Sequence, residues 1–199
     1  MIRAEDIIEE INDLWSPVYP FMAAHVLSVA GIRSGEFLDL GPFAGGLALS
    51  LLAECAGLRA KVVDESERML KWVEKRSRAM GCSSRLTTHR CAIEPIPEVD
   101  DSFDLVTVRG AFFFVTPLLL QEVKRVLRPG GFGWIGGGYG PLTPESVIAP
   151  IAERSKRLNE DIGKRRIEEG EAKGLLETAG LAPVARISTE GGFWIEVRG

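Results

Sequence analysis

The last segments of the chain place the strongest limit on its fold. Two strand-like stretches, PVARIST at residues 183–189 and FWIEVR at 193–198, are separated only by residues 190–192, which include two glycines. A connection between parallel strands needs a dozen or more residues, so these two strands form an antiparallel hairpin. If the first strand of the hairpin continues a parallel sheet, the second must run against it.

Upstream of the hairpin, short apolar runs alternate with segments of helical periodicity, which is typical of a parallel α/β sheet. FDLVTV at 103–108 is apolar almost throughout, so we expect it at the centre of the sheet, and the more polar SRLTTHRC at 84–91 near an edge. Gly57, Gly81 and the RPGG at 128–131 mark the ends of helices. The expected strands cover residues 36–40, 60–64, 84–91, 103–108, 132–138, 183–189 and 193–198, and the expected helices cover 47–57, 66–81, 118–127 and 172–180.

Length and charge favour one domain that handles a small molecule. The chain has 199 residues, 45% of them hydrophobic, which suffices for one buried core, and we expect a single domain over 1–199. Its net charge of -4 argues against an extended nucleic-acid surface, so no nucleic-acid partner is expected. The apolar stretches are too short to cross a membrane. Nothing in the sequence indicates an oligomeric state.

The cysteines and histidines do not form a metal-binding pattern. Cys55, Cys82, Cys91, His25 and His89 lack ligand spacing, so no metal is expected. An odd and sparse set of cysteines is typical of a reducing compartment. The acidic start MIRAEDIIEEIND differs from a signal peptide, which begins basic and continues apolar. We therefore expect a cytoplasmic protein.

Five segments of the sequence resemble motifs of a known family. Each match is weak alone, but their order and spacing together are specific. They are FLDLGPFAGG at 37–46, VVDESERML at 62–70, FDLVTVRGAFFFV at 103–115, EVKRVLRPGGFGWIGGG at 122–138 and GLLETAGLAPVARIST with GGFWIEVRG at 174–199. Over about residues 15–199 the chain resembles the class I S-adenosylmethionine-dependent methyltransferases, in particular the ubiquinone/menaquinone-biosynthesis-like enzymes that act on small molecules. The resemblance implies a Rossmann-like seven-stranded, mostly parallel sheet with helices on both faces and an antiparallel last strand.

The same resemblance implies an activity. It implies a methyltransferase that takes the methyl group from S-adenosyl-L-methionine and passes it to a small-molecule acceptor. The cofactor carries its own activated methyl group and the family has no universal catalytic residue, so no catalytic residue is assigned. Residues 1–35 are expected to form an N-terminal helical cap, and residues 139–171 an insertion on the substrate side, most simply a solvated helix.

The glycine loop departs from the family pattern. Gly41 and Gly45 stand where the outer glycines belong and follow Asp39, but Phe43 replaces the middle glycine and Pro42 removes a donor. The methionine tail of the cofactor presents a carboxylate and an ammonium rather than a phosphate, so the loop needs donors and a close turn. Phe43 either forms a wall beside the sulfonium, with cation-π character, or packs beneath the following helix.

The nucleoside of the cofactor has expected partners at two strand ends. Asp64 closes the second expected strand and is placed to accept hydrogen bonds from the ribose hydroxyls. Glu65 either shares this task or is a solvated turn acid. After the third strand the family commonly places an acid for the adenine amino group, whereas Cys91 and Ala92 stand here, so adenine would rely on backbone groups and stacking. The expected cofactor-binding residues are Tyr19, Asp39, Gly41, Phe43, Gly45, Asp64, Glu65, Cys91, Ala92 and Arg109.

Other residues belong near the carboxyl ends of the strands, where open α/β sheets bind ligands. Arg109 either positions an acidic substrate or the cofactor's carboxylate, or is a surface or helix-cap arginine. At least one of the phenylalanines at 112–114 is expected to line an apolar pocket, and Tyr139 lies close to the same edge. Tyr19 belongs to the cap, and His25 is either a general base or a structural histidine.

Two other functions fit parts of the sequence. Phe43 and Cys91 favour a catalytically inert module that binds S-adenosylmethionine or S-adenosylhomocysteine, or a partner subunit on the same fold. A nicotinamide-dependent oxidoreductase would use Asp64 on its ribose, but the missing GxGxxG and the closing hairpin argue against it. The KRR at 164–166 either meets an anionic ligand or forms a solvated face.

Overall fold

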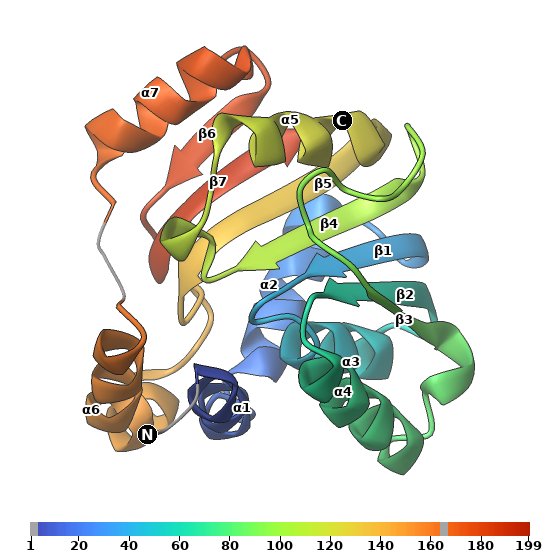
Figure 1. The fold of residues 1–199 in the computed structure, drawn as a ribbon, viewed down its shortest axis with the longest axis vertical. Helices are drawn as coiled ribbons and strands as arrows, with labels where there is room; N and C mark the ends of the chain where they lie inside the picture. The colour runs from blue at the N-terminus through green and yellow to red at the C-terminus, as the bar shows by residue number, and fades with distance from the viewer. Residues whose placement is uncertain (1–3, 164–166) are drawn as a thin grey trace.

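The computed structural model describes residues 4–163 and 167–199 and shows a seven-stranded sheet with helices on both faces (Figure 1). The strand order is β3-β2-β1-β4-β5-β7-β6; β7 is antiparallel to both of its neighbours, and the other pairings are parallel. The fold class expected from the sequence is therefore confirmed. The strands are β1 (Ser34–Leu40), β2 (Gly57–Asp64), β3 (Leu86–Arg90), β4 (Phe103–Arg109), β5 (Leu127–Gly138), β6 (Ala185–Ser188) and β7 (Gly192–Arg198).

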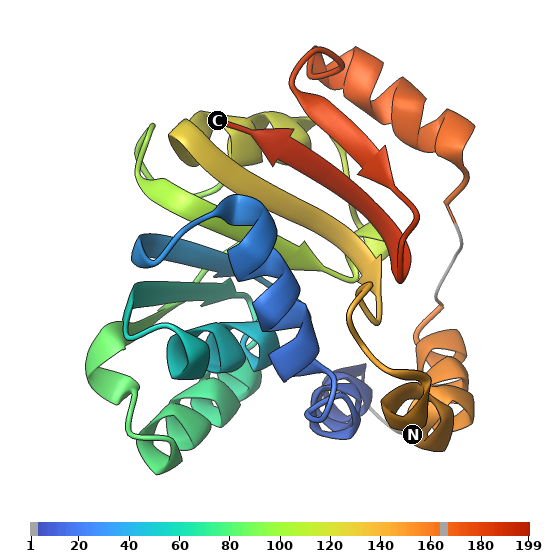
Figure 2. The ribbon, with the colours of Figure 1, turned by 180° about the vertical axis from the view of Figure 1, so that it is seen from behind.

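Helices cover the two faces of the sheet in separate groups. Helices α2, α3 and α4 pack on one face, and α5 and α7 on the other; Figure 2 shows α2 in front of the sheet with α3 and α4 below it. The side chains of β1 alternate between these two faces. Phe37 packs with α2 and α3 on one face, and Leu38 and Leu40 pack with α5 and α7 on the other. The helices are α1 (Ala4–Leu14), α2 (Tyr19–Ala30), α3 (Gly46–Glu54), α4 (Glu67–Ala79), α5 (Pro117–Val126), α6 (Glu145–Asp161) and α7 (Glu169–Ala179), with short 3-10 helices at Ser83–Arg85 and Ala111–Phe113.

The sequence signals for helix starts and for strand positions are confirmed. Ser66 caps α4 by accepting a hydrogen bond from the Met69 N–H at 3.3 Å, and Thr116 caps α5 by accepting one from the Leu119 N–H at 2.9 Å. The apolar β4 lies in the middle of the sheet and the polar β3 at its edge. A helix cap depends on residues a few positions apart. The position of a strand in the sheet depends on whether one or both of its faces are buried. Both properties can be seen in a single segment of the sequence.

One expected helix end is wrong, and a second, at residue 127, is confirmed within one residue because α5 ends at Val126. Helix α3 ends at Glu54, and Gly57 is instead the first residue of β2. A Cβ at position 57 would lie 2.5 Å from the Arg33 carbonyl oxygen, so glycine is needed there because strands approach closely. The RPGG that was expected to stop a helix lies inside β5, where the pairing with β4 shifts between Phe103 and Leu105.

Helix α6 is not simply a solvated insertion. It buries Ile151, Ser155, Leu158 and Asn159, which recur every three or four residues and so lie on one face. The Trp15 indole donates a hydrogen bond of 2.8 Å to Ser155 Oγ, which joins α6 to the end of α1. The sequence of this segment is rich in charged residues, which made the narrow buried face of the helix difficult to recognise. The KRR at 164–166 lies outside the described residues.

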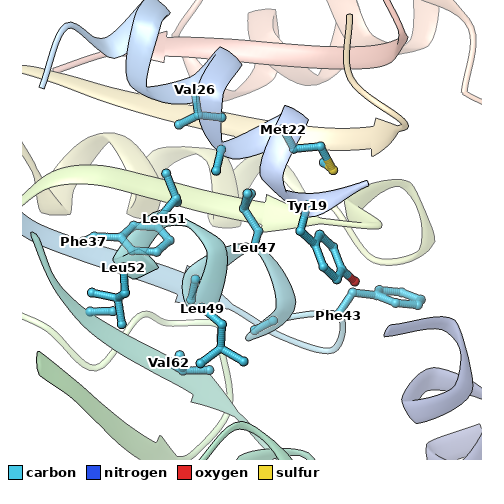
Figure 3. Packing of buried hydrophobic residues seen from close by; sticks show 14 of the residues in the cluster. Tyr19, Met22, Val26, Phe37, Phe43, Leu47, Leu49, Leu51, Leu52 and Val62 are labelled. Carbon is cyan, nitrogen blue, oxygen red and sulfur yellow. The ribbon is translucent and has the colours of Figure 1, made fainter. Parts of the chain in front are cut away.

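Helix α3 is buried nearly all round, as its sequence predicts. Figure 3 shows its leucines packed between Val26 of α2 and Val62 of β2. Phe43, in the loop before this helix, belongs to the same buried cluster, and its ring projects away from the labelled leucines. This position directs Phe43 toward the end of the sheet where α1 lies.

Candidate functional site

The loop between β1 and α3 is built around two glycines. The Gly41 N–H donates to the Val63 carbonyl at 2.8 Å, which joins the end of β1 to β2. Gly45 has φ of 104°, and a Cβ there would lie 2.2 Å from Val73 Cγ2 on α4. An L side chain rarely adopts that backbone conformation and has no room there, so both sterics and packing require glycine.

Asp39 holds this loop from below. Its carboxylate is fully buried, and it accepts hydrogen bonds from the Gly45 N–H at 2.7 Å and from Thr107 Oγ1 at 2.5 Å. Burial raises the pKa of Asp39 to about 6, and these two hydrogen bonds act in the opposite direction. The carboxylate therefore links β1, β4 and the loop, while a direct contact with a cofactor stays a prediction.

Asp64 lies in a cavity at the carboxyl end of β2, called here the Asp64 cavity. One carboxylate oxygen, Oδ1, accepts from the Ser66 N–H at 2.8 Å, and the other, Oδ2, is buried without a hydrogen-bond partner. A Cβ at position 41 would lie 2.4 Å from Oδ2, so glycine is needed there to leave room for this carboxylate. Burial raises the pKa of Asp64 to about 6. The cavity of about 360 Å³ is lined by Gly41, Pro42, Asp64, Glu65, Ala92, Ile93, Glu94, Phe114, Thr116 and Leu119.

The segment after β3 contributes different residues from those expected. Ala92 lines the Asp64 cavity, but Cys91 packs beside the core under α5 and is not part of the lining. Burial raises the pKa of the Cys91 thiol, which keeps it neutral. Glu94 lines the cavity and accepts a hydrogen bond from the Thr116 hydroxyl. The sequence analysis missed Glu94, although it is the first acid after β3 and so carried a usable signal.

Glu65 has the environment of a solvated turn acid, the second of the two alternatives for this residue. It is exposed, and it lines both the Asp64 cavity and a shallow polar depression beside α4. The Glu65 carbonyl oxygen accepts a hydrogen bond of 3.1 Å from Arg90 Nε. The Glu65 side chain therefore lies at the rim of the Asp64 cavity and is exposed to solvent.

Arg109 lines a second cavity, called here the Arg109 cavity. The guanidinium is 4% exposed and lies 4.9 Å from the ring centre of Trp15 and 4.6 Å from that of Tyr19. Its Nη1 atom has no hydrogen-bond partner in the described part of the chain. The alternative of a surface or helix-cap arginine is therefore wrong. The cavity measures about 420 Å³ and is lined by Ile11, Trp15, Phe43, Arg109, Gly110, Phe112, Phe113, Gly137, Gly138, Asn159, Ile167, Gly192 and Phe193.

Tyr19 supports Arg109 and covers the start of α3. Its hydroxyl donates to Asn12 Oδ1 at 2.6 Å, and a Cβ at position 46 would strike its ring. Burial raises the pKa of Tyr19, partly offset by the guanidinium of Arg109. Tyr19 does not line either cavity among the described residues, so its contact with a cofactor stays a prediction.

Five aromatic side chains line the Arg109 cavity. Phe43 and Phe113 have ring centres 5.6 Å apart, and Phe112 meets Phe193 edge to face at 5.3 Å. Phe114 points to the Asp64 cavity instead. The expectation that at least one of the phenylalanines at 112–114 lines an apolar pocket is confirmed. The loop residues divide in the same way, because Pro42 lines one cavity and Phe43 the other.

Two residues weighed for catalysis lie elsewhere. His25 is half-buried on α2, with its ring centre 5.7 Å from that of Trp134, and burial lowers its pKa. Neither cavity described above includes His25 in its described lining, which favours the structural alternative. Tyr139 stacks on Trp15 with ring centres 4.6 Å apart and lines a smaller cavity beside α6.

Ion pairs hold α1 against two other helices at this end of the sheet. Arg68 of α4 pairs with Asp6 and with Glu9, and Arg154 of α6 pairs with Glu10. Figures 1 and 2 both show α1 beside α6, at the end of the molecule that also carries the N-terminus. Through Ile11, this helix provides part of the wall of the Arg109 cavity.

Fold and site together define a class of protein. The two cavities lie at the carboxyl ends of β2 and β4, the edge at which open α/β sheets bind nucleotide-type ligands. An unpartnered carboxylate oxygen opposite a glycine fits a sugar diol, which offers two hydroxyl donors. These features define an α/β domain of the kind that binds nucleotide-type cofactors, with a second, mainly apolar cavity at the same edge of the sheet.

Comparisons with known proteins give the family. A family described as "Methyltransferase domain" matches residues 37–131. A ubiquinone/menaquinone biosynthesis C-methyltransferase of Paracoccus denitrificans is 34% identical over 133 residues, which cover 65% of this chain and 53% of the relative. The corresponding protein of Shewanella frigidimarina is 32% identical over 127 residues, which cover 61% and 50%. The chain thus spans about half the length of the curated relatives it matches.

Solved structures show the same fold. A putative S-adenosyl-L-methionine-dependent methyltransferase of Methanococcus maripaludis has a TM-score of 0.81 at 24% identity, covering 98% of this chain and 91% of that one. A SAM dependent methyltransferase from Aquifex aeolicus has a TM-score of 0.65 at 20% identity, covering 96% of each chain. Residues 37–131 thus match a methyltransferase family, and the chain has the fold of solved S-adenosylmethionine-dependent methyltransferases.

Two features are absent from residues 4–163 and 167–199. No helix there combines the length and the apolar character needed to span a bilayer. No group of three or more histidine, cysteine, aspartate or glutamate side chains gathers there as a potential metal site.

Proposed function

We propose that this chain is a methyltransferase that binds S-adenosylmethionine and transfers its methyl group to a small-molecule acceptor. One observation carries the proposal: Asp64 is buried at the carboxyl end of β2, with Oδ2 unpartnered and Gly41 opposite it. A buried carboxylate oxygen without a partner is costly, and a ligand that donates to it offsets this cost. Methyltransferase relatives over more than half of the chain support the assignment.

The Asp64 cavity is proposed as the nucleoside site. Asp64 accepts hydrogen bonds from the ribose hydroxyls, and Glu65 at the rim adds negative charge beside them. Ala92 and the neighbouring backbone lie where the base would be held, and Glu94 supplies the acid that the sequence lacks at residues 91–92. The cavity volume of about 360 Å³ lies within the range of small-ligand sites.

The loop between the two cavities is proposed to hold the methionine portion. When bound, the cofactor supplies a methyl group already activated on a sulfonium, so the chain's own work is to orient and to exclude water. Asp39 fixes the loop through Gly45, and Phe43 presents its ring on the side of the Arg109 cavity. Gly41 lines the opposite cavity and allows the turn between them.

The Arg109 cavity is proposed as the acceptor site. Its volume of about 420 Å³ suits a small molecule. Ile11 and Trp15 enter it from the proposed cap at 1–35, and Asn159 and Ile167 from the proposed substrate-side insertion at 139–171. Within a single domain over 1–199, these two segments close the cavity and limit access of water to the methyl group.

The remaining expectations about the protein's surroundings are also proposals. A net charge of -4 supports a small molecule rather than a nucleic acid as the partner. Three free cysteines, Cys55, Cys82 and Cys91, support a reducing cytoplasmic setting.

Calorimetric titration with S-adenosylhomocysteine tests the nucleoside site. We expect binding to the wild type and affinity about 10- to 100-fold weaker in Asp64→Asn, because a carboxylate that accepts two hydroxyl donors is lost. Asp100→Asn is the matched control, since Asp100 is exposed, pairs with Arg125 and does not line this cavity. No binding by the wild type at high micromolar ligand would refute the proposal.

Methyl transfer is tested separately with labelled S-adenosylmethionine and a panel of small acids, phenols, thiols and amines. Transfer to any of them, dependent on Asp64, supports an enzyme. Tight cofactor binding without transfer to any acceptor favours the inert binding module instead.

A further inference from the structure

Arg109 is the one charged side chain on the described walls of the Arg109 cavity. Its charge interacts with the buried Asp39 carboxylate and with the Tyr19 hydroxyl, but its Nη1 is buried without a hydrogen-bond partner among the described residues. The rings of Trp15 and Tyr19 stabilise the cation on its faces and leave this in-plane N–H group unsatisfied. An unsatisfied guanidinium N–H in an apolar site is costly, so the geometry calls for an oxyanion from the ligand.

The rest of the wall determines what else the ligand carries. Ile11, Phe43, Phe112, Phe113 and Phe193 surround the cavity with aliphatic and aromatic carbon. No described carboxylate or imidazole lines it, so a ligand ammonium would find no anionic partner there. One fixed positive charge among apolar walls selects a ligand with an apolar body and one planar anionic group, which a carboxylate supplies.

The two cavities assign this carboxylate to the acceptor rather than to the cofactor. The residues that line the Asp64 cavity, proposed for the nucleoside, and those that line the Arg109 cavity have no member in common. Resting on the proposed function, we infer that the methyl acceptor is a small apolar acid whose carboxylate binds Arg109 and whose hydrocarbon or ring portion packs against the phenylalanines.

A matched pair of probes tests this inference on the protein itself. Calorimetry compares 3-phenylpropionate with its neutral amide, 3-phenylpropionamide, with and without S-adenosylhomocysteine. The wild type is expected to bind the acid about 10- to 100-fold more tightly, and Arg109→Gln to lose this preference. Arg109→Lys, which keeps the charge, is expected to retain part of it. Arg157→Gln, a change at an exposed arginine of α6, is expected to retain all of it.

Three outcomes would overturn the inference: equal affinity of the wild type for acid and amide, no binding of either, or an unchanged preference in Arg109→Gln. The first two need only the wild type, so the test stands even if the variant fails to fold. Because the probes are also titrated without cofactor, a failure to bind S-adenosylhomocysteine refutes the proposed function without deciding the acid preference.

A second comparison separates the two sources of a carboxylate. S-adenosylhomocysteine carries the amino-acid carboxylate, and 5′-methylthioadenosine lacks it. We expect Arg109→Gln to bind both nucleosides within about threefold of the wild type, a difference of less than about 1 kcal/mol. A selective loss of S-adenosylhomocysteine affinity, with 5′-methylthioadenosine unaffected, would assign the guanidinium to the cofactor's carboxylate and overturn the inference.

Discussion

Replacing Asp64 by asparagine removes a buried charge while leaving an oxygen for the Ser66 N–H. In the folded protein, burial raises the pKa of Asp64 from an ordinary 3.8 to about 6. Since each tenfold change in an ionisation equilibrium corresponds to about 1.4 kcal/mol, this rise amounts to about 3 kcal/mol. Above pH 6 the wild type carries this cost in its free energy of unfolding, and Asp64→Asn does not.

The sign of the pH dependence follows from which state binds the proton more tightly. Between pH 3.8 and about 6 the folded wild type binds more protons than the unfolded chain, so lowering the pH stabilises it. The asparagine variant lacks this titration. We therefore expect the unfolding free energy of the wild type, relative to Asp64→Asn, to rise by about 3 kcal/mol from pH 8 to pH 4.

Urea denaturation of the cofactor-free proteins at several pH values measures this difference. Asp39 also has a raised pKa, but its contribution is common to both proteins and is removed by subtraction. The absolute difference at pH 8 includes the new asparagine N–H group, so the slope is the decisive quantity. A difference that stays constant with pH would refute the reasoning.

Three further substitutions test the structure around the site by urea denaturation. Gly45→Ala should lower the unfolding free energy by about 2–4 kcal/mol, because the residue has φ of 104° and its new methyl group would strike Val73; a neutral effect would contradict this geometry. Thr107→Val should cost about 1–3 kcal/mol, since buried Asp39 loses a hydrogen-bond donor, and should raise the pKa of that carboxyl further; an unchanged protein would argue against the bond. Arg154→Gln should change stability by less than about 1 kcal/mol because its ion pair is exposed, and a larger loss would show that α1 depends on it.

The sequence predicted features that depend on local chemistry. Ser66 and Thr116 were recognisable caps because a hydroxyl before an apolar helix satisfies a nearby N–H. The closing hairpin followed from the length of its connection, and the sheet with its antiparallel strand followed with it. Asp64 was found at a strand end, and the structure places it in a cavity, although its role toward a cofactor stays a prediction.

Features that depend on distant contacts could not be predicted in this way. Arg109 is buried because Trp15 and Tyr19, about 90 residues earlier in the sequence, stack on it. Helix α6 packs its buried residues toward α1, where Ser155 accepts a hydrogen bond from Trp15. The many charged residues of α6 gave no indication of this contact, because they lie on its other sides. Glu94 was missed because the resemblance places the acid for adenine at residues 91–92, whereas residues 92–94 all line the cavity.

One wall of the Arg109 cavity is bare backbone. Gly137, Gly138 and Gly192, from the antiparallel pair β5 and β7, line it without side chains. Gly138 and Gly192 have φ of 146° and 155° and close neighbours, but Gly137 has neither, and a Cβ there would meet nothing within 4 Å. A single methyl group at position 137 would thus narrow the chamber without disturbing the strands. In the cavity proposed for the acceptor, a change of Gly137 to alanine therefore alters the available volume at little cost in stability.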